Sequence, residues 1–330
     1  MSGQLWAVNA LGGFMYSDEL SELLRTKLQP TVKFRQLCDA KDATNKGLNR
    51  GDTFNWNVYQ DVADAGNDLD ETVAIPETNF TIETASLTIG EIGNSVPYSG
   101  LLNNFSKQPV EEIIKYALKN DARKVLDAKA HNQFNQTDLT VQATSGTSTT
   151  AVTATEGGEA ITNNVAFGKG HVKAIVDVMK ERDIPGYMGD EYYAIAWPTT
   201  YRTMKNDLES IKQYIETGFG YIMNGEIGRY EGVRFMEQSG VAKGGGVDST
   251  TWTYLTTDAW DNAKSDWIFF LGEDTVAEAI AIPEEMRGKI PTDFGRSRGV
   301  AWYYLGGFGL VHTGSNTSSN SRVVKWETAA

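Results

Sequence analysis

Residues 53–59 read TFNWNVY, and in this run Phe54, Trp56 and Val58 alternate with polar residues. Alternation with a period of two is the pattern of a strand that buries one face. The polar and acidic segment DVADAGNDLDETVAIPET follows at residues 61–78, before the next apolar run. We therefore interpret residues 53–59 as the first arm of a hairpin whose tip is acidic.

The second arm of the predicted hairpin is residues 79–92, NFTIETASLTIGEI. Phe80 and Ile82 lie in one phase of the alternation, whereas Leu87 and Ile89 lie in the other. This change of phase predicts a bulge or a kink within a long strand. Arms of roughly 20 residues would reach on the order of 60 Å. Because an isolated two-stranded ribbon is only marginally stable, we expect the hairpin to lie on a neighbouring molecule, which indicates assembly rather than catalysis.

A long helix is predicted directly after the hairpin, over residues 106–134, SKQPVEEIIKYALKNDARKVLDAKAHNQF. Ser106 is a candidate N-cap, and Pro109 suits the first turn. Asp121 falls inside the apolar stripe, so either it pairs with a basic group from elsewhere or the helix bends there. One side of the helix is apolar at helical spacing and consists of Val110, Ile114, Ala117, Leu118 and Val125.

Three clusters of charge are candidates for contacts between copies of the chain. The first is the acidic hairpin tip, and the other two are a basic side of the helix and a basic segment late in the chain. The simpler interpretation is that all three are solvated, since surface ion pairs contribute little. The clusters are Asp64, Asp68, Asp70 and Glu71; Lys115, Lys119 and Arg123; and Arg287, Lys289, Arg296 and Arg298.

Composition limits the class of protein. The chain has 330 residues, of which 40% are hydrophobic and 22% charged, so a large core is expected. The net charge of −13 argues against a dedicated nucleic-acid binder, because Lys and Arg neutralise phosphates. Cys38 is the single cysteine, which excludes an intrachain disulfide framework and fits a reducing compartment. No apolar run is long enough for a membrane span, and the first residues make a poor signal peptide.

No catalytic, cofactor or metal site is predicted from the motifs. The three histidines, His131, His171 and His312, have no metal-ligand spacing. The aspartates of the hairpin tip miss the spacing of a calcium loop. No phosphate-binding loop is present, because the glycines of residues 307–309 lie within a late apolar strand instead of preceding a helix. No GxSxG motif occurs either.

The rest of the chain mixes strands and helices without a strict βαβ repeat, so we predict an α+β fold. Residues 137–164 are rich in Thr, Ser and Gly and predict a polar loop or exposed ribbon. The predicted helices cover residues 18–28 and 169–186 and a segment after Pro198. The predicted strands cover residues 191–197, 233–236, 252–255, 266–282 and 300–312 and a final VVKW.

The order of these pieces resembles the major capsid protein of tailed double-stranded-DNA bacteriophages. Local matches are IGNSVPYSGLLNNFSKQPVEEIIKYAL, GEIGRYEGVRF and YYAIAWPTTYRTM, which look like coat proteins of podophage-like viruses with a separate scaffolding protein. The resemblance implies an N-terminal arm at 1–50, an E-loop hairpin at 51–105, and a spine helix with the first part of the P-domain at 106–165. It further implies an A-domain at 166–290 and, at 291–330, the return strand of the P-domain with the C-terminus.

The resemblance also implies a function and partners. Hexamers and pentamers of the chain would build an icosahedral shell around double-stranded DNA, which the shell would touch weakly and without sequence preference. Further implied partners are scaffolding, portal and possible decoration proteins, and assembly would take place in the host bacterial cytoplasm. Two alternatives stay open: an encapsulin-type compartment shell, and a β-rich virion or surface protein that binds glycans.

Overall fold

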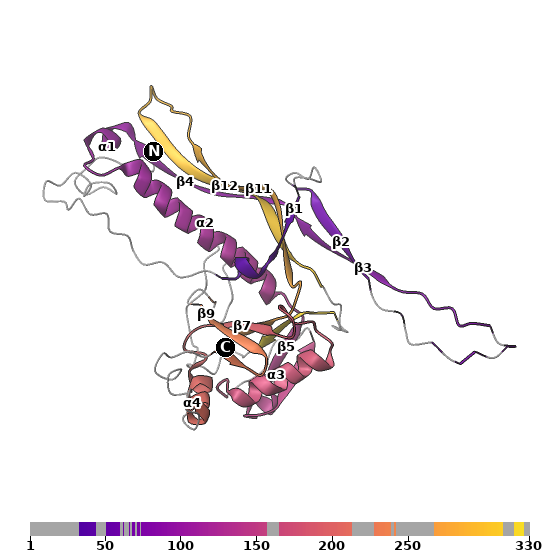
Figure 1. Cartoon of the computed structure of the whole chain (residues 1–330). Coiled ribbons are helices and arrows are strands. Elements are labelled where there is room, and N and C mark those ends of the chain that lie inside the picture. Colours follow the sequence, from indigo (N-terminus) through magenta and orange to yellow (C-terminus); the bar gives the residue numbers. More distant parts are fainter. Residues whose placement is uncertain are drawn as a thin grey trace.

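The computed structural model describes residues 33–43, 51–59, 74–156, 165–212, 228–238, 267–312 and 320–326, with six further positions between 62 and 72 and Val241. The described chain forms two bodies, each built on a mixed β-sheet, and a hairpin that projects away from both (Figure 1). Helices and sheets are mixed in the order that the α+β prediction requires, so the predicted fold class is confirmed.

The first body is a four-stranded sheet with one long helix, α2 (Val110–Asn135), running along it (Figure 1). Strand β1 joins the edge in parallel, and the other pairs are antiparallel. The short helix α1 (Gly100–Phe105) links the last strand of the sheet to α2. The strands lie in the order β1 (Asp39–Asp42), β11 (Val276–Gly288), β12 (Ser297–Leu310) and β4 (Gly90–Ser99).

The core of the first body lies between α2 and β12. Val300, Trp302 and Tyr304, within the strand predicted over residues 300–312, point to the same side of β12 and are buried against the apolar side of α2. The apolar stripe continues past Asp121, whose Oδ2 accepts hydrogen bonds from the Trp302 indole at 2.8 Å and from the Asn94 amide at 2.9 Å. The polar residue within the stripe is therefore satisfied by neutral donors and not by a basic group.

The second body is a seven-stranded sheet with two helices. Helix α3 (Lys169–Glu181), predicted over residues 169–186, buries Val172, Ile175, Val176 and Met179 on one side, and α4 (Arg202–Lys212) follows Pro198 as expected. The strand order is β6 (Val152–Glu156), β5 (Leu139–Ala143), β13 (Val323–Trp326), β10 (Ile268–Leu271), β7 (Tyr192–Ala196), β9 (Val233–Glu237) and β8 (Arg229–Tyr230).

The hairpin consists of β2 (Thr53–Tyr59) and β3 (Ile82–Thr88), which pair without interruption from Thr53–Thr88 to Tyr59–Ile82. The predicted bulge or kink is therefore wrong within β3. The phase changes because different faces are covered along the arm: Leu87 packs against the body, whereas Ile82 lies on the opposite, exposed face. The paired arms are seven residues long, shorter than the roughly 20 residues that alternation alone allowed.

Two further predictions need correction. Ser106 does not cap α2; it ends α1, and its hydroxyl bonds to the backbone of Gln108, while Pro109 takes the N-cap position of α2. Residues 137–164 are not simply an exposed loop, because β5 is buried and pairs with β6 and β13. Threonine suits such a strand because its branched side chain fits the pleated surface. The predicted helix 18–28 and strand 252–255 lie outside the described residues.

Candidate assembly interface

The outer face of the hairpin carries large apolar side chains that the chain itself leaves uncovered. Tyr59, Phe80 and Ile82 are 67%, 56% and 47% exposed, and the rings of Tyr59 and Phe80 lie 6.5 Å apart. Because side chains alternate across a strand, this face is opposite to the one that Phe54 and Leu87 bury against the body. A cluster of three exposed apolar residues on a projecting ribbon indicates a contact surface.

The acidic tip of the hairpin is described only in part. Asp68 and Glu71 are exposed, while Asp64 and Asp70 lie outside the described residues. Among the residues that the structure describes, no group of three or more His, Cys, Asp or Glu side chains is placed to hold a metal ion.

The basic side of α2 is exposed near the start of the helix. Lys115 forms an ion pair of 2.6 Å with Glu111 one turn earlier, and this hydrogen bond raises the pKa of the Lys115 ammonium. Lys119 and Arg123 follow on the same side and are exposed. Since an exposed i,i+4 pair contributes little stability, Lys115 keeps its capacity to exchange partners.

The late basic segment is the turn between β11 and β12. Arg287 pairs with Glu285 and stacks over the Tyr303 ring at 3.7 Å. Lys289 donates to the Ser297 hydroxyl. Arg296 and Arg298 are exposed, and Arg296 contacts Asp293 at 3.7 Å while the Arg298 guanidinium reaches the Gly295 carbonyl at 3.4 Å. Two exposed apolar residues of the same turn are Ile290 and Phe294.

Both basic clusters lie at the end of the molecule opposite to the hairpin (Figure 1). The backbone amide of Gly100 donates to the Arg296 carbonyl at 2.8 Å, which fixes the β11–β12 turn beside α1 and close to the start of α2. The hairpin leaves from the other end of the four-stranded sheet and points away from it. The structure therefore brings the two basic clusters near each other but separates both from the acidic tip within one chain.

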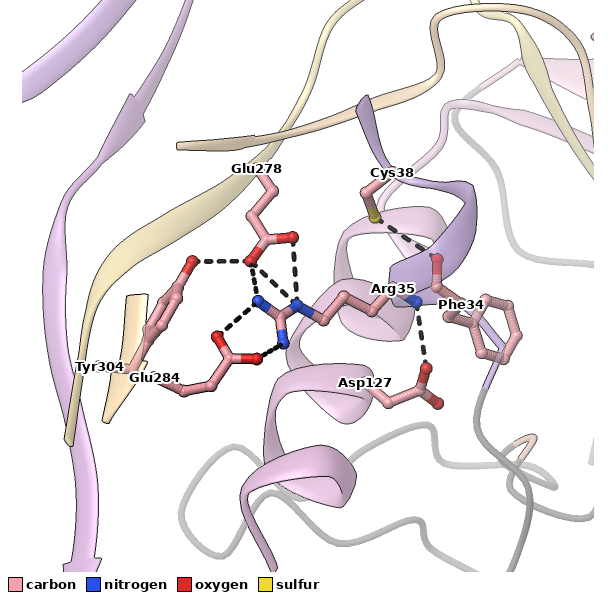
Figure 2. Close-up of polar contacts among 7 residues, drawn as sticks. All are labelled: Phe34, Arg35, Cys38, Asp127, Glu278, Glu284 and Tyr304. Atoms are coloured by element: carbon pink, nitrogen blue, oxygen red, sulfur yellow. Dashed lines mark hydrogen bonds and ion pairs between the residues drawn. The ribbon is translucent and has the colours of Figure 1, made fainter. Parts of the chain in front are cut away.

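A partly buried network of charged side chains, which we name the arm anchor, joins the N-terminal segment to α2, β11 and β12 of the first body (Figure 2). The Arg35 guanidinium pairs with Glu278 of β11 at 2.8 Å and bonds both oxygens of Glu284 at 2.9 and 3.0 Å. The Tyr304 hydroxyl donates to Glu278 at 2.8 Å. The Arg35 backbone amide donates at 3.1 Å to Asp127 of α2.

Two further contacts complete the arm anchor. The second oxygen of Asp127 accepts at 2.9 Å from the side chain of Gln238, which follows β9 in the second body. Phe34 is fully buried and meets His131 and Phe269 edge-on, at 4.6 and 5.7 Å between ring centroids. Phe34 and Leu37 therefore contribute to a core cluster that includes residues of both bodies.

The electrostatics of the arm anchor follow from burial and pairing. Burial lowers the pKa of the Arg35 guanidinium, but its hydrogen bonds to Glu284 and Glu278 outweigh burial and raise the pKa overall. The hydrogen bond from Arg35 holds the pKa of Glu284 below its ordinary value. Burial, followed by the charge of Glu278, raises the pKa of the Tyr304 hydroxyl, and burial likewise raises the pKa of the Cys38 thiol. Tyr304 therefore acts as a hydrogen-bond donor, and Cys38 stays a thiol.

The three histidines have structural surroundings. His131 is fully buried, and burial followed by the charge of Lys325 lowers its pKa to about 3. The His171 ring accepts from the Gly168 amide at 3.1 Å and lies 2.9 Å from the Ser148 carbonyl, which joins α3 to the loop after β5. His312 lies 3.5 Å from Asp274, beside a groove of about 500 Å³ that runs along β2.

The base of the hairpin rests on a run of glycines in β12. A Cβ atom at Gly307 would lie 2.4 Å from the Thr88 carbonyl oxygen, and one at Gly309 would lie 2.9 Å from Leu87. The Trp56 indole donates to the Val311 carbonyl at 3.0 Å and ties the other arm to the end of β12. Glycine within a strand is a signal of close backbone approach, and this signal in residues 306–309 was available from the sequence. The arm anchor had no such local signal.

Comparison with known proteins supports the architecture. No protein-family model matches the sequence, and no curated protein matches it. Among solved structures, the capsid of cyanophage Pam1 matches with a TM-score of 0.69 and 14% identity over 98% of this chain and all of that one. The head of Helicobacter pylori bacteriophage KHP40 matches with a TM-score of 0.67 and 10% identity over 94% and 95%.

A gene-transfer-agent capsid also matches, with a TM-score of 0.56 and 15% identity over 98% of this chain and 99% of that chain. The three matches cover 94–98% of this chain and 95–100% of the other chains. Identities of 10–15% concern the backbone arrangement and not individual side chains. The chain therefore has the fold of the major capsid proteins of tailed bacteriophages.

Proposed function

We propose that this chain is the shell-forming protein of a tailed-phage capsid, which assembles as hexamers and pentamers into an icosahedral shell around double-stranded DNA. The observation that carries the proposal is the hairpin. Its outer face exposes Tyr59, Phe80 and Ile82 to solvent on a ribbon that projects beyond the rest of the chain. A soluble protein gains nothing from such a surface unless another molecule covers it. The fold match to capsid proteins over nearly the whole chain supports a second copy as that molecule.

We also propose how neighbouring copies recognise each other. The acidic tip of one hairpin would lie on the basic end of the next copy, formed by the start of α2 and the β11–β12 turn. Support comes from the opposite placement of the two kinds of charge in one chain, because a head-to-tail contact repeats around a ring. Each ion pair contributes only about 0–1 kcal/mol, but every subunit of a shell repeats it.

Further parts of the proposal concern organisation and partners. We keep the division into an arm (1–50), hairpin segment (51–105), spine-helix segment (106–165), A-domain (166–290) and return segment (291–330), with β4 and α1 lying beyond the hairpin itself. The implied partners are a separately encoded scaffolding protein, a portal protein and possible decoration proteins. Assembly in the host bacterial cytoplasm fits the single cysteine. Among the described residues, no helix is both long and apolar enough to span a membrane.

Negative-stain microscopy of the purified chain, alone and expressed with a scaffolding protein, tests the proposal. Large uniform polyhedral shells or ring-shaped capsomers are the expected result. Small shells of about 60 copies would instead favour an encapsulin-type compartment. A discrete monomer or trimer under all conditions would contradict both shells and favour a virion or surface protein that binds glycans.

The proposed contact is tested by exchanging charge. Asp68→Lys with Asp70→Lys should impair assembly, and a second change that makes Lys119 and Arg123, or Arg296 and Arg298, acidic should partly restore it. A matched control is Asp177→Lys with Glu181→Lys, which makes the same change of charge on the exposed side of α3. Normal assembly of the tip variant over a range of salt, or rescue by neither basic cluster, would remove the ionic contact from the proposal.

A further inference from the structure

Strand β12 lies between the arm anchor and the base of the hairpin. Side chains alternate across a strand, so even-numbered residues of β12 face α2 and odd-numbered ones face the hairpin. Tyr304 faces α2 and donates to Glu278 in the arm anchor. Leu305 lies on the other face, in one apolar cluster with Phe54 and Leu87 of the hairpin. The arm anchor and the hairpin base are thus in contact with opposite sides of one strand.

Neither face of β12 has room for a side chain at Gly306 or Gly307. On the anchor side, a Cβ atom at Gly306 would lie 2.4 Å from the Tyr304 hydroxyl. On the hairpin side, a Cβ atom at Gly307 would lie 2.4 Å from the Thr88 carbonyl. Interiors packed this closely transmit displacements because they have no free volume to absorb them. The Tyr304 hydroxyl and the hairpin base therefore lie close to the backbone of neighbouring residues in β12.

Strand β11, which pairs with β12, also contacts the arm anchor on one face and the hairpin base on the other. Glu278 pairs in register with Phe308 and holds Arg35, whereas its neighbours Ala277 and Ala279 face the hairpin and pair with Gly309 and Gly307. At these two positions β11 carries only alanine, so the hairpin base packs close to the backbones of both strands. Arg35 therefore fixes, through Glu278 and Tyr304, the two strands that carry the hairpin.

We propose that β11 and β12 couple the seating of the N-terminal segment to the orientation of the hairpin. When Arg35 is bound, Glu278 and Tyr304 keep their positions. The glycines of residues 306–309, on which the hairpin base rests, then keep one backbone geometry. Without Arg35, Glu278 and Glu284 would face each other with no cation, and the strands would move to separate or solvate them. The coupling is a property of the single chain, so it stands or fails independently of the proposed shell.

Coupling between two sites is reciprocal, so the experiment perturbs each site and measures the effect at the other. Amide hydrogen exchange of the full-length unassembled chain is measured by mass spectrometry for β1, for β3 and for β6, which packs against the core of the second body that excludes Phe34. Arg35→Gln should increase exchange in β1 and also in β3, by roughly tenfold, within the range typical of coupled sites, while β6 stays unchanged. Arg35→Lys, which keeps the positive charge, should restore part of the protection in β3.

The reciprocal variant and a control complete the design. Gly307→Ala lifts the hairpin base and should increase exchange in β1, whereas Arg234→Gln, which removes an arginine paired with Glu191 in the second body, should affect neither β1 nor β3. Tyr304→Phe removes the hydroxyl that joins the two sides and should add little to the effect of Arg35→Gln on β3. Faster exchange in β1 with β3 unchanged, or equally faster exchange in β1, β3 and β6, would overturn the coupling.

Discussion

Truncating Trp302 tests the packing between α2 and β12. The side chain is 2% exposed and lies in the cluster that joins the four-stranded sheet to the long helix. Trp302→Ala should lower the free energy of unfolding by about 3–5 kcal/mol, the usual cost of removing a buried aromatic side chain. Trp302→Phe keeps most of the packing but loses the indole bond to Asp121. Because Asp121 is only half-buried and keeps the bond from Asn94, this second cost should be near 1 kcal/mol.

Denaturant titration followed by circular dichroism measures both variants against the unaltered chain. Phe294→Ala is the matched control, since this aromatic residue of the β11–β12 turn is fully exposed and its truncation should stay within about 0.5 kcal/mol. The predicted packing is contradicted if Trp302→Ala lowers the free energy of unfolding by less than about 1 kcal/mol, or if Trp302→Phe lowers it as much as Trp302→Ala does. The second result would mean that the hydrogen bond to Asp121, and not the packed ring, holds the helix on the sheet.

Two further predictions concern pH. The folded chain keeps His131 neutral down to its pKa of about 3, while the unfolded chain binds the proton near pH 6.5, so this residue costs stability as pH falls from 6.5 to 3. His131→Phe should therefore gain stability relative to the unaltered chain over that range, and a constant difference between pH 7 and pH 4 in denaturant titrations would refute this. Hydrogen bonding from Arg35 lowers the pKa of Glu284 in the folded chain, so the pairing stabilises fully above pH 4.5 and is lost progressively as pH falls from there through the lower folded pKa. Glu284→Gln should be less stable than the unaltered chain at pH 7, and this deficit should shrink as pH falls below 4.5; a deficit that stays constant as pH falls would contradict the assignment.

The parts of the fold that the sequence predicted are those with short-range patterns. The period-two alternation in residues 53–59 places β2 with its observed bounds, and the spacing of apolar residues in α3 places its buried side. The order of these elements was enough to predict the α+β class and the similarity to capsid proteins. Periodicity succeeds here because each strand or helix buries one face against a sheet, and burial of one face is what periodicity reports.

Other features depend on contacts that no local pattern encodes. Arg35 is separated from Glu278 by 243 residues and from Glu284 by 249, so spacing in the sequence could not join them. The segment TVAEAIAI lies within the strand predicted over residues 266–282, but its alternation does not indicate what the charged Glu278 contacts. In the structure Glu278 is buried, because Arg35 and the Tyr304 hydroxyl satisfy its oxygens. A charge within an alternating apolar strand is thus as consistent with a buried ion pair as with solvent.

The glycines of residues 306–309 can be interpreted either as a phosphate-binding loop or as a site of close backbone approach. Tested as a phosphate-binding loop, the pattern fails, because no helix follows and the segment lies inside β12. Tested as strand geometry, the pattern predicts that another backbone approaches on each face from which a side chain is missing. The structure places the hairpin base against Gly307 and Gly309 on one face, and the Tyr304 hydroxyl over Gly306 on the other. Substituting any of these glycines therefore changes a contact between segments and not a ligand site. The hairpin and the N-terminal segment are thus expected to respond together to such a substitution.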